Sequence, residues 1–175
     1  MKKQLVVILA ILAIFVTGFA SPAAAYNPTD LQKLLQTNAC TNCDLSNAQL
    51  SYTELSGADM QSSNMKGIKL SGAILRSAKL NSADLTSESK SHPTTRLTGA
   101  DLTNAQLQSA ILKNVDLSST DLSNANLNEA NLTGADLSYA VLIGASKTGT
   151  IFEDVTYCCT RMSQDYTRAS FCCLD

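Results

Sequence analysis

The stretch ANLNEANLTGADLSYAVLIGA, residues 125–145, repeats itself every five residues. A leucine returns at each fifth position, and an alanine stands two residues before each leucine. In an α-helix, five residues advance by about 500°, so these leucines would form no stripe. In a strand, odd spacing would place alternate leucines on opposite faces. The chain must therefore turn within each group of five residues.

Three extended residues followed by a two-residue corner fit this period. We take the leucine as the centre of each repeat. The centre and the residue two before it then share the inner face, because strand side chains alternate, and the residue between them points outward. The centres are Leu45, Leu50, Leu55, Met60, Met65, Leu70, Leu75, Leu80 and Leu85, then Leu97, Leu102, Leu107, Leu112, Leu117, Leu122, Leu127, Leu132, Leu137 and Leu142.

The second residue after each centre tests this geometry, because a tight corner favours a positive φ angle, which glycine and then asparagine tolerate best. Every glycine beyond residue 25 falls at that position, and so do several asparagines. These residues are Gly57, Gly67, Gly72, Gly99, Gly134, Gly144, Gly149, Asn47, Asn104, Asn114 and Asn124. A corner of about 90° every five residues closes a square in about 20 residues, and such squares stack about 4.8 Å apart. The sequence therefore predicts an all-β solenoid.

The tandem A(D/N)LXX pattern resembles the pentapeptide repeat family, over about Cys40 to Tyr157. This resemblance implies a right-handed quadrilateral β-helix. The segment CTNCDLSNAQL, residues 40–50, also resembles the opening of many bacterial members. Exported members of this kind resemble those of cyanobacteria, which are assigned to the periplasm or the thylakoid lumen. We therefore expect this chain in one of those two compartments.

Residues 1–25 have the pattern of a secretory signal. Lys2 and Lys3 precede an apolar run from Leu5 to Phe19, and an A-x-A site ends at Ala25. We expect cleavage between Ala25 and Tyr26 and no stable membrane insertion afterwards, because a spanning helix needs about 20 apolar residues. An uncleaved anchor is the alternative. Without the two lysines, 11 basic residues face 15 acidic ones, a net charge of −4, which argues against a basic nucleic-acid surface.

The open ends of a solenoid need caps, because they expose unpaired strand edges and the apolar axis. Residues 26–39 are expected to supply the first cap, with Asn27 before a helix over about Pro28–Gln36. Residues 40–157 form the predicted β-helix, and residues 158–175 a cysteine-rich C-terminal cap. Within the β-helix, the polar segment TSESKSHPTT, residues 86–95, interrupts the repeat. We expect this insertion loop to bulge from a corner.

Cysteines lie only near the two ends of the repeat region. They are Cys40, Cys43, Cys158, Cys159, Cys172 and Cys173. In an exported chain they are disulfide candidates rather than metal ligands. Five to six coils separate the two groups by roughly 25 Å, whereas a disulfide spans Cα atoms within about 7 Å. Cys40 and Cys43 therefore either bridge locally or leave Cys43 as a buried thiol. Cys158 and Cys159 can reach Cys172 and Cys173, with no pairing indicated.

The repeats contain no motif for catalysis. The chain has one histidine, no nucleophile motif and no phosphate-binding loop. We therefore expect a non-enzyme without a cofactor or metal. The insertion loop is the least repetitive surface and the best candidate for a specific contact with a partner. Its candidate contact residues are Glu88, Lys90 and His92. The alternative interpretation is an insertion without a function that the repeat array tolerates.

The most plausible function from sequence is a scaffold or protein-interaction module in an exported compartment. Its protein partner is unknown, and no nucleic acid is expected to bind. Two alternatives are weaker. Some pentapeptide repeat proteins bind DNA gyrase as acidic DNA mimics, but the signal and basic residues such as Lys66 and Lys69 disfavour this reading. A thiol-redox role for Cys40 and Cys43 would require a depressed thiol pKa.

Overall fold

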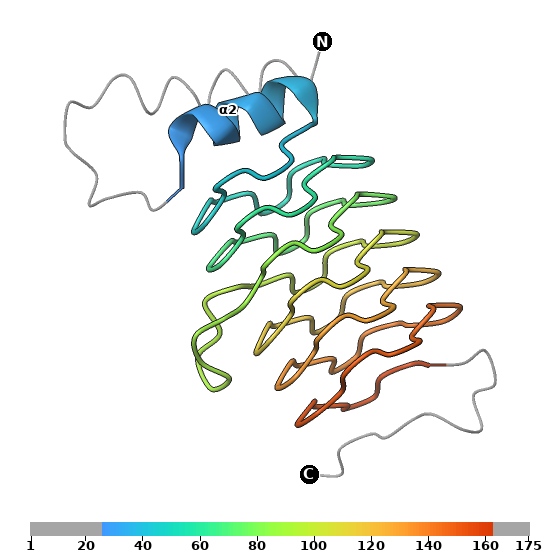
Figure 1. Cartoon of the computed structure of the whole chain (residues 1–175). Helices are drawn as coiled ribbons and strands as arrows, with labels where there is room; N and C mark the ends of the chain where they lie inside the picture. The colour runs from blue at the N-terminus through green and yellow to red at the C-terminus, as the bar shows by residue number, and fades with distance from the viewer. Residues whose placement is uncertain (1–25, 163–175) are drawn as a thin grey trace.

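The computed structural model describes residues 26–162. They form a stack of square coils with helix α2, Pro28–Thr37, across its N-terminal end (Figure 1). Parallel bridges join outward residues 20 positions apart, as between Asp44 and Asn64, or 27 apart where residues 86–95 intervene, as between Lys69 and Arg96. The all-β solenoid predicted from the period of five is therefore confirmed. The predicted signal, residues 1–25, and residues 163–175 of the predicted C-terminal cap lie outside the described part.

The outward residues stack in four columns, one on each face of the solenoid. Each bridged residue immediately precedes a centre, and every strand is reduced to this single bridged position. The columns are: face 1, Ala39, Asp59, Lys79, Gln106, Asn126, Ser146; face 2, Asp44, Asn64, Asp84, Ile111, Asn131, Ile151; face 3, Gln49, Lys69, Arg96, Asp116, Asp136, Thr156; face 4, Glu54, Ile74, Asp101, Asp121, Val141, Arg161.

Backbone hydrogen bonds hold successive coils together and close each corner. Leu45 N donates to Asn64 O at 2.8 Å, and Asn64 N donates to Cys43 O at 2.9 Å. Within the first corner, Ala48 N donates to Leu45 O at 3.1 Å, and Asn47 has a φ angle of 59°. All the glycines and asparagines singled out from the sequence have positive φ angles, which confirms the predicted corners.

Several corners nevertheless carry side chains for which a positive φ is unfavourable. Tyr52, Glu129, Tyr139 and Asp154 have φ angles between 53° and 61°. The left-handed region costs an L-residue about 1–2 kcal/mol. The ladder bonds on both sides of each corner fix the backbone, so the fold imposes this conformation whatever residue occupies the position.

The axis is filled by the predicted centres and by the small residues beside them. All leucine and methionine centres from Leu45 to Leu142 are buried. Ile68 and Val115, which replace the small inner residue, are buried as well. Inward hydroxyls are satisfied, as where Thr120 Oγ1 donates to Leu117 O at 2.6 Å. In the last coil Phe152 and Tyr157 are only partly buried against this core.

Helix α2 covers the first coil and pairs with its exposed edge. Asn27 Oδ1 accepts from Thr29 N at 3.0 Å as the N-cap, and the helix ends one residue beyond the expected Gln36. Asn27 N donates to Asp44 O at 2.9 Å, and Asp44 N donates to Asp30 Oδ2 at 2.9 Å. The start of the helix therefore supplies the hydrogen bonds that a preceding coil would otherwise make.

Candidate functional site

The base of the insertion loop is closed by hydrogen bonds to the coils. Thr95 Oγ1 accepts from Gly67 N at 2.7 Å, and Thr94 N donates to Ser87 Oγ at 2.7 Å. Two neighbouring cations of face 3 hold the segment of the loop that leads back to the coil. Lys69 Nζ donates to Thr94 O, and Arg96 Nε donates to the carbonyl of Pro93 at 3.2 Å.

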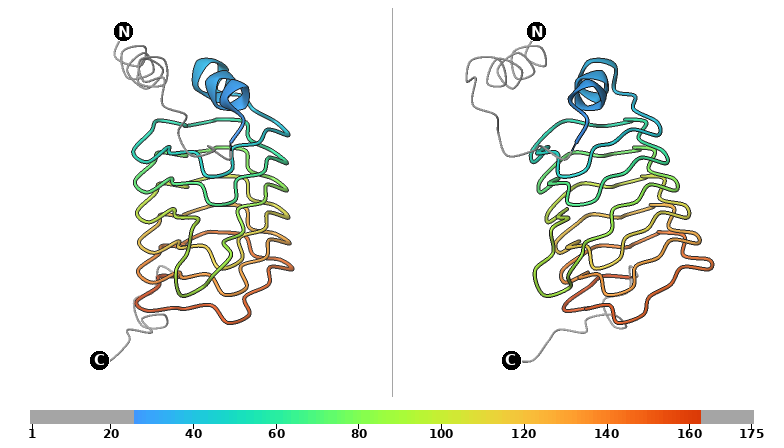
Figure 2. Two further views of the ribbon diagram at one scale, coloured as in Figure 1. Left: turned by 90° about the vertical axis from the view of Figure 1, so that its left-hand side faces the viewer. Right: turned by 60° about the vertical axis from the view of Figure 1, so that its left-hand side comes forward.

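The insertion loop leaves the stack at a corner, as expected from the sequence, and then lies along the coils below it. It leaves the third coil and descends over the corners between faces 2 and 3 (Figure 2). Asn114 Nδ2 donates to Ser87 O at 3.2 Å, and Lys90 Nζ donates to Asp154 O. Between them, a Cβ on Gly134 would lie 3.7 Å from Lys90 Cδ. The Lys90 stem therefore passes this corner at ordinary contact distance, whereas the atom that a Cβ here would meet too closely is Asn114 Oδ1.

The three candidate contact residues differ in their freedom. Glu88, Lys90 and His92 are all exposed, and no hydrogen bond or ion pair of the described residues joins them to one another. The Lys90 ammonium is already used to fasten the loop. His92 Nδ1 lies 3.2 Å from Ser91 Oγ, its neighbour in the chain. Glu88 and His92 are thus presented to solvent, whereas Lys90 has a structural role that the sequence did not indicate.

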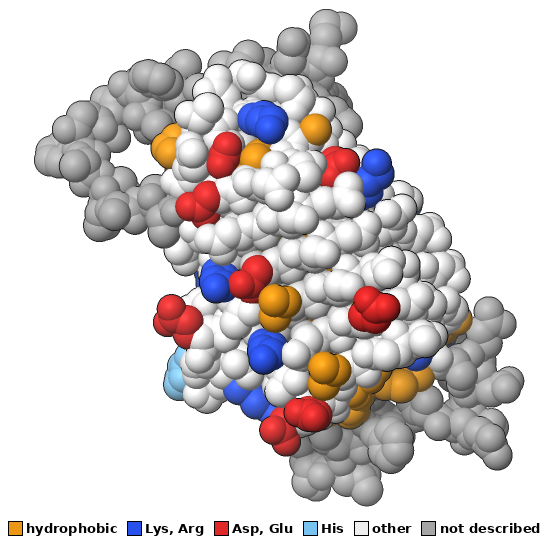
Figure 3. All heavy atoms as spheres, in the orientation of Figure 1, with side chains coloured by type: hydrophobic (Ala, Val, Ile, Leu, Met, Phe, Trp, Pro, Cys, Tyr) orange, Lys and Arg blue, Asp and Glu red, His pale blue; other side chains and the backbone are white. Residues whose placement is uncertain are grey.

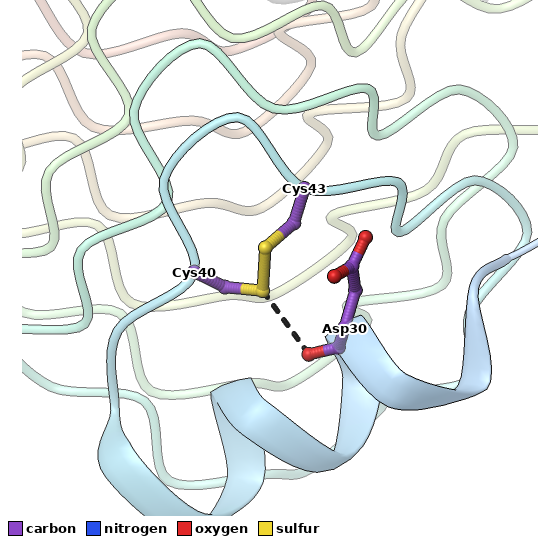
Figure 4. Close-up of side chains that lie close together, drawn as sticks. All are labelled: Asp30, Cys40 and Cys43. Atoms are coloured by element: carbon purple, nitrogen blue, oxygen red, sulfur yellow. Dashed lines mark hydrogen bonds between the residues drawn. A yellow bond between two sulfur atoms is a disulfide. The ribbon is translucent and has the colours of Figure 1, made fainter.

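Cys40 and Cys43 form a disulfide within the first coil, beside helix α2 (Figure 4). Of the two alternatives left open by the sequence, the structure has the bridge, with Cα atoms 5.4 Å apart. Cys40 is 0% and Cys43 4% exposed. Cys40 Sγ lies 3.0 Å from the carbonyl oxygen of Asp30. An oxidised sulfur carries no hydrogen, so this is a close sulfur–oxygen contact against the helix.

The sulfurs and the Asp30 carboxylate lie within 4.8 Å of one another, as metal ligands would. A disulfide sulfur is not a thiolate, and the thiolate is the form that binds metal. One Asp30 oxygen is also engaged by Asp44 N. The group therefore fits a fastening for the cap better than a metal site.

At the other end, Cys158 and Cys159 are both disulfide-bonded and half-buried. Cys159 has a φ angle of 54° and occupies a corner after Tyr157, as the repeat phase predicts. Cys172 and Cys173 lie outside the described residues.

Charged side chains of both signs are scattered over the surface shown in Figure 3. Lys66 Nζ lies 3.1 Å from Asp84 Oδ2, and Lys79 Nζ lies 3.6 Å from Asp59 Oδ2. Partial burial of Asp84 acts to raise its pKa, but hydrogen bonds from Thr86 and the charge of Lys66 outweigh this, so its pKa lies below the ordinary value. These shifts have structural causes in the repeat and indicate no acid–base site.

Burial lowers the pKa of Lys69, and the neighbouring charge of Arg96 adds to the effect. The two cations follow one another in the column of face 3. Among the described residues, neither has a carboxylate within ion-pair distance. Their hydrogen bonds to the insertion loop account for their position.

A model of the family "Pentapeptide repeats" matches the sequence in eight copies, over residues 40–76, 54–87, 95–118 and 116–154. The chain belongs to the pentapeptide repeat family. Its members form right-handed quadrilateral β-helices, in agreement with the square coils described above. The gap between the second and third matched segments coincides with the insertion loop.

Several solved pentapeptide repeat proteins are similar to this chain. Rfr23 from the cyanobacterium Cyanothece 51142 has 27% identity, covering 71% of this chain and 98% of that one, with a TM-score of 0.39. A protein from the Arabidopsis thaliana thylakoid lumen has 28% identity, covering 67% and 70%, with a TM-score of 0.39. QnrB1, a plasmid-mediated fluoroquinolone resistance protein, has 20% identity, covering 77% and 78%, with a TM-score of 0.35. At these TM-scores, the family assignment rests on the repeats alone.

No curated protein matches the sequence significantly. Within residues 26–162, no helix has both the length and the apolar character needed to cross a membrane.

Proposed function

We propose that this chain is a non-enzymatic scaffold that holds a partner protein against its outer surface in an exported compartment. The observation that carries the proposal is the fixed register of the outward residues, which ladder hydrogen bonds hold in four straight columns. A preorganised surface loses little conformational freedom on binding, which favours association.

The use of polar side chains by the repeat supports a non-enzymatic role. Outward carboxylates accept hydrogen bonds from corner N–H groups, as where Ser118 N donates to Asp116 Oδ1 at 3.0 Å and Ser138 N to Asp136 Oδ1 at 2.8 Å. Such bonds recur at the corners and satisfy the backbone. The aspartates and serines that are abundant in the sequence therefore have an architectural explanation.

Two features support export to the periplasm or the thylakoid lumen. The N-terminal sequence has the charged, apolar and A-x-A parts of a secretory signal. The described chain also contains the Cys40–Cys43 disulfide, and disulfides persist mainly in oxidising compartments.

The proposal is tested by affinity capture from the periplasmic or lumenal fraction of the source cells. The mature chain, beginning at Tyr26, is compared with a variant in which Glu88, Lys90 and His92 are all replaced by alanine. We expect the mature chain to retain a defined protein, and the variant to lose it if the insertion loop makes the contact. Asn126→Lys, on a different face, serves as a folded control. Retention of no protein by the mature chain would remove the support for a scaffold.

Mixed charge speaks against the DNA-mimic alternative. Lys79 follows Asp59 on face 1, and Lys69 and Arg96 follow one another on face 3, so neither column presents a continuous negative surface. Inhibition of gyrase supercoiling by the mature chain in vitro would overturn this conclusion.

Burial speaks against the thiol-redox alternative. Thiol–disulfide exchange requires a thiolate to reach a sulfur atom, and both sulfurs lie beneath helix α2, with Cys40 fully buried. Insulin reduction at the same rate by the mature chain and by a Cys40→Ser/Cys43→Ser variant is the expected result. A rate lost only in the variant would restore the redox alternative.

A further inference from the structure

Tyr52 and Tyr139 are the most exposed large apolar side chains of the described residues, at 83% and 63%. Both lie at the corner between faces 3 and 4. The residues of this corner in the first five coils are Tyr52, Gly72, Gly99, Ser119 and Tyr139, and we call them the tyrosine edge; Cys159 holds the same corner in the sixth coil. Four coil steps of about 4.8 Å separate the two tyrosines, a span of about 19 Å.

The fold gives no reason for a tyrosine at either position. The φ angles are 60° at Tyr52 and 61° at Tyr139, in the left-handed region that bulky residues disfavour. Glycine, asparagine or serine occupies most other corners. Each ring is also largely in water, so it contributes little burial in return. Tyr52 does lie across Gly72, because a Cβ at residue 72 would be 2.6 Å from two of its ring atoms.

The surface beside the C-terminal half of the tyrosine edge is acidic, whereas beside Gly72 and Gly99 face 3 carries Lys69 and Arg96, whose head groups bond to the insertion loop. Asp116 and Asp136 are consecutive on face 3, and their Oδ1 atoms accept from Ser118 N and Ser138 N, which lead into this corner. Asp121 lies beyond the corner, on face 4. Within residues 26–162, none of the three has a basic side chain within 4.0 Å. Asp116 follows Arg96 in the column, and Asp136 follows Asp116. Like charges on neighbouring strands repel, so a cation beside Asp136 would stabilise the pair.

We propose that the tyrosine edge binds an extended, basic segment of a partner protein. Arginine or lysine side chains of that segment lie over the rings of Tyr52 and Tyr139, where cation–π attraction acts. The carboxylates of Asp116 and Asp136, with Asp121, attract the same charges. An extended chain rises about 3.3 Å per residue, so about six residues span the edge. The carboxylates beside Ser119 and Tyr139 favour this partner over an acidic one. The ring of Tyr52 lies across Gly72, so the segment passes over that ring, and the small residues Gly99 and Ser119 leave the rest of the path to Tyr139 open.

This inference rests on the proposed scaffold function and names its surface and partner chemistry. The probe is a synthetic octapeptide of alternating arginine and serine, and the control peptide has glutamate in place of arginine. Binding is measured by titration calorimetry, because tyrosine emission would come from all five tyrosines of the chain and would lose its edge signal in the tyrosine variant. The edge variants are Tyr52→Asn with Tyr139→Asn, and Asp116→Asn with Asp136→Asn. Glu129→Gln and Ile151→Thr are matched controls, which remove a charge and an exposed apolar side chain on other parts of the surface.

We expect saturable binding of the basic peptide to the mature chain, and we expect salt to weaken it. In each edge variant the dissociation constant should rise at least about tenfold. The controls should bind within about twofold of the unaltered chain. The tyrosine variant should melt at or above the original temperature, because asparagine tolerates the corner φ better. A purely structural role for the tyrosines predicts the opposite change in melting.

Equal binding by the edge variants, or no binding by the mature chain, would overturn the inference. Binding of the acidic peptide or of a neutral oligosaccharide in place of the basic peptide would also overturn it. Affinity capture of the partner protein distinguishes failure of this inference from failure of the scaffold proposal. If the mature chain and the tyrosine variant retain a captured partner equally, the scaffold proposal stands and binding at the tyrosine edge is contradicted. If no partner is captured, the scaffold proposal is contradicted.

Discussion

Leu122→Ala is the sharpest test of how the coils are packed. Leu122 is a centre in the fourth coil and is 0% exposed. Its backbone is fixed to the next coil, because Leu122 N donates to Val141 O at 2.7 Å. The preceding residue is fixed to the previous coil, because Asp121 N donates to Ala100 O at 3.0 Å. The walls therefore cannot close around the space left by the removed methyl groups. We expect a loss of about 3–5 kcal/mol, in the upper part of the range for buried leucines.

The assay is equilibrium unfolding in urea of the mature chain and its variants. With a slope of about 2 kcal/mol per M, this loss lowers the midpoint by about 1.5–2.5 M. Leu122→Met is the matched control. The protein already places Met60 and Met65 at buried centres, so this variant should cost less than about 1.5 kcal/mol. Asn126→Lys changes an outward residue and should shift the midpoint little.

Either of two outcomes would refute this reasoning. If Asn126→Lys were the most destabilised, the assignment of inner and outer positions would be wrong. If Leu122→Ala cost no more than Leu122→Met, the coils would have to close around cavities, and the ladder would not be the rigid frame described above.

Three further predictions follow from other contacts. Replacing Cys40 and Cys43 by alanine should cost about 2 kcal/mol, the loop-closure entropy of so short a bridge, and hydrogen exchange of helix α2 should speed up while that of the central coils stays unchanged. The pKa of Asp84 is lowered in the folded state, so its contribution to stability is present above its ordinary pKa of 3.8 and is lost as the pH falls through the lower folded value. Asp84→Asn should therefore reduce the melting temperature at pH 7 and flatten its decline below about pH 4; an equal loss at all pH values would contradict this assignment. Lys90→Ala should release the insertion loop, with faster amide exchange in the last coil and little change in the first; unchanged exchange would show that the lysine does not fasten the loop.

The repeat made most of the architecture predictable because its information is local. A leucine every fifth residue and a glycine two residues later, as at Leu132 and Gly134, fix both the inner face and the corner. The columns then follow from four corners in each coil. The same logic placed Cys43 toward the axis, where it is buried, although the repeat could not decide whether it was bridged.

The path of the insertion loop was not predictable, because it depends on residues far apart in the sequence. Lys90 meets the backbone of Asp154, 64 positions later, and crosses Gly134 on the way. Nothing local to TSESKSHPTT indicates this path. Tyr52 and Tyr139 were missed as well, since both keep the repeat phase and only their φ angles and exposure set them apart. The sequence signal for them is a bulky aromatic where glycine or asparagine would serve the corner better.

The insertion loop also changes how the molecule would carry a mechanical load. In a plain stack each coil is bonded only to its neighbours, so coils pulled apart along the axis bear the tension in series and separate one after another. The loop leaves the third coil and is fastened by Lys90 to the sixth. Over these coils the tension has two parallel routes, the backbone ladder and the loop. Among the described residues, the hydrogen bonds of the loop reach the second coil, at Gly67 and Lys69, but not the first, so a pull along the axis should separate the first coil before the others.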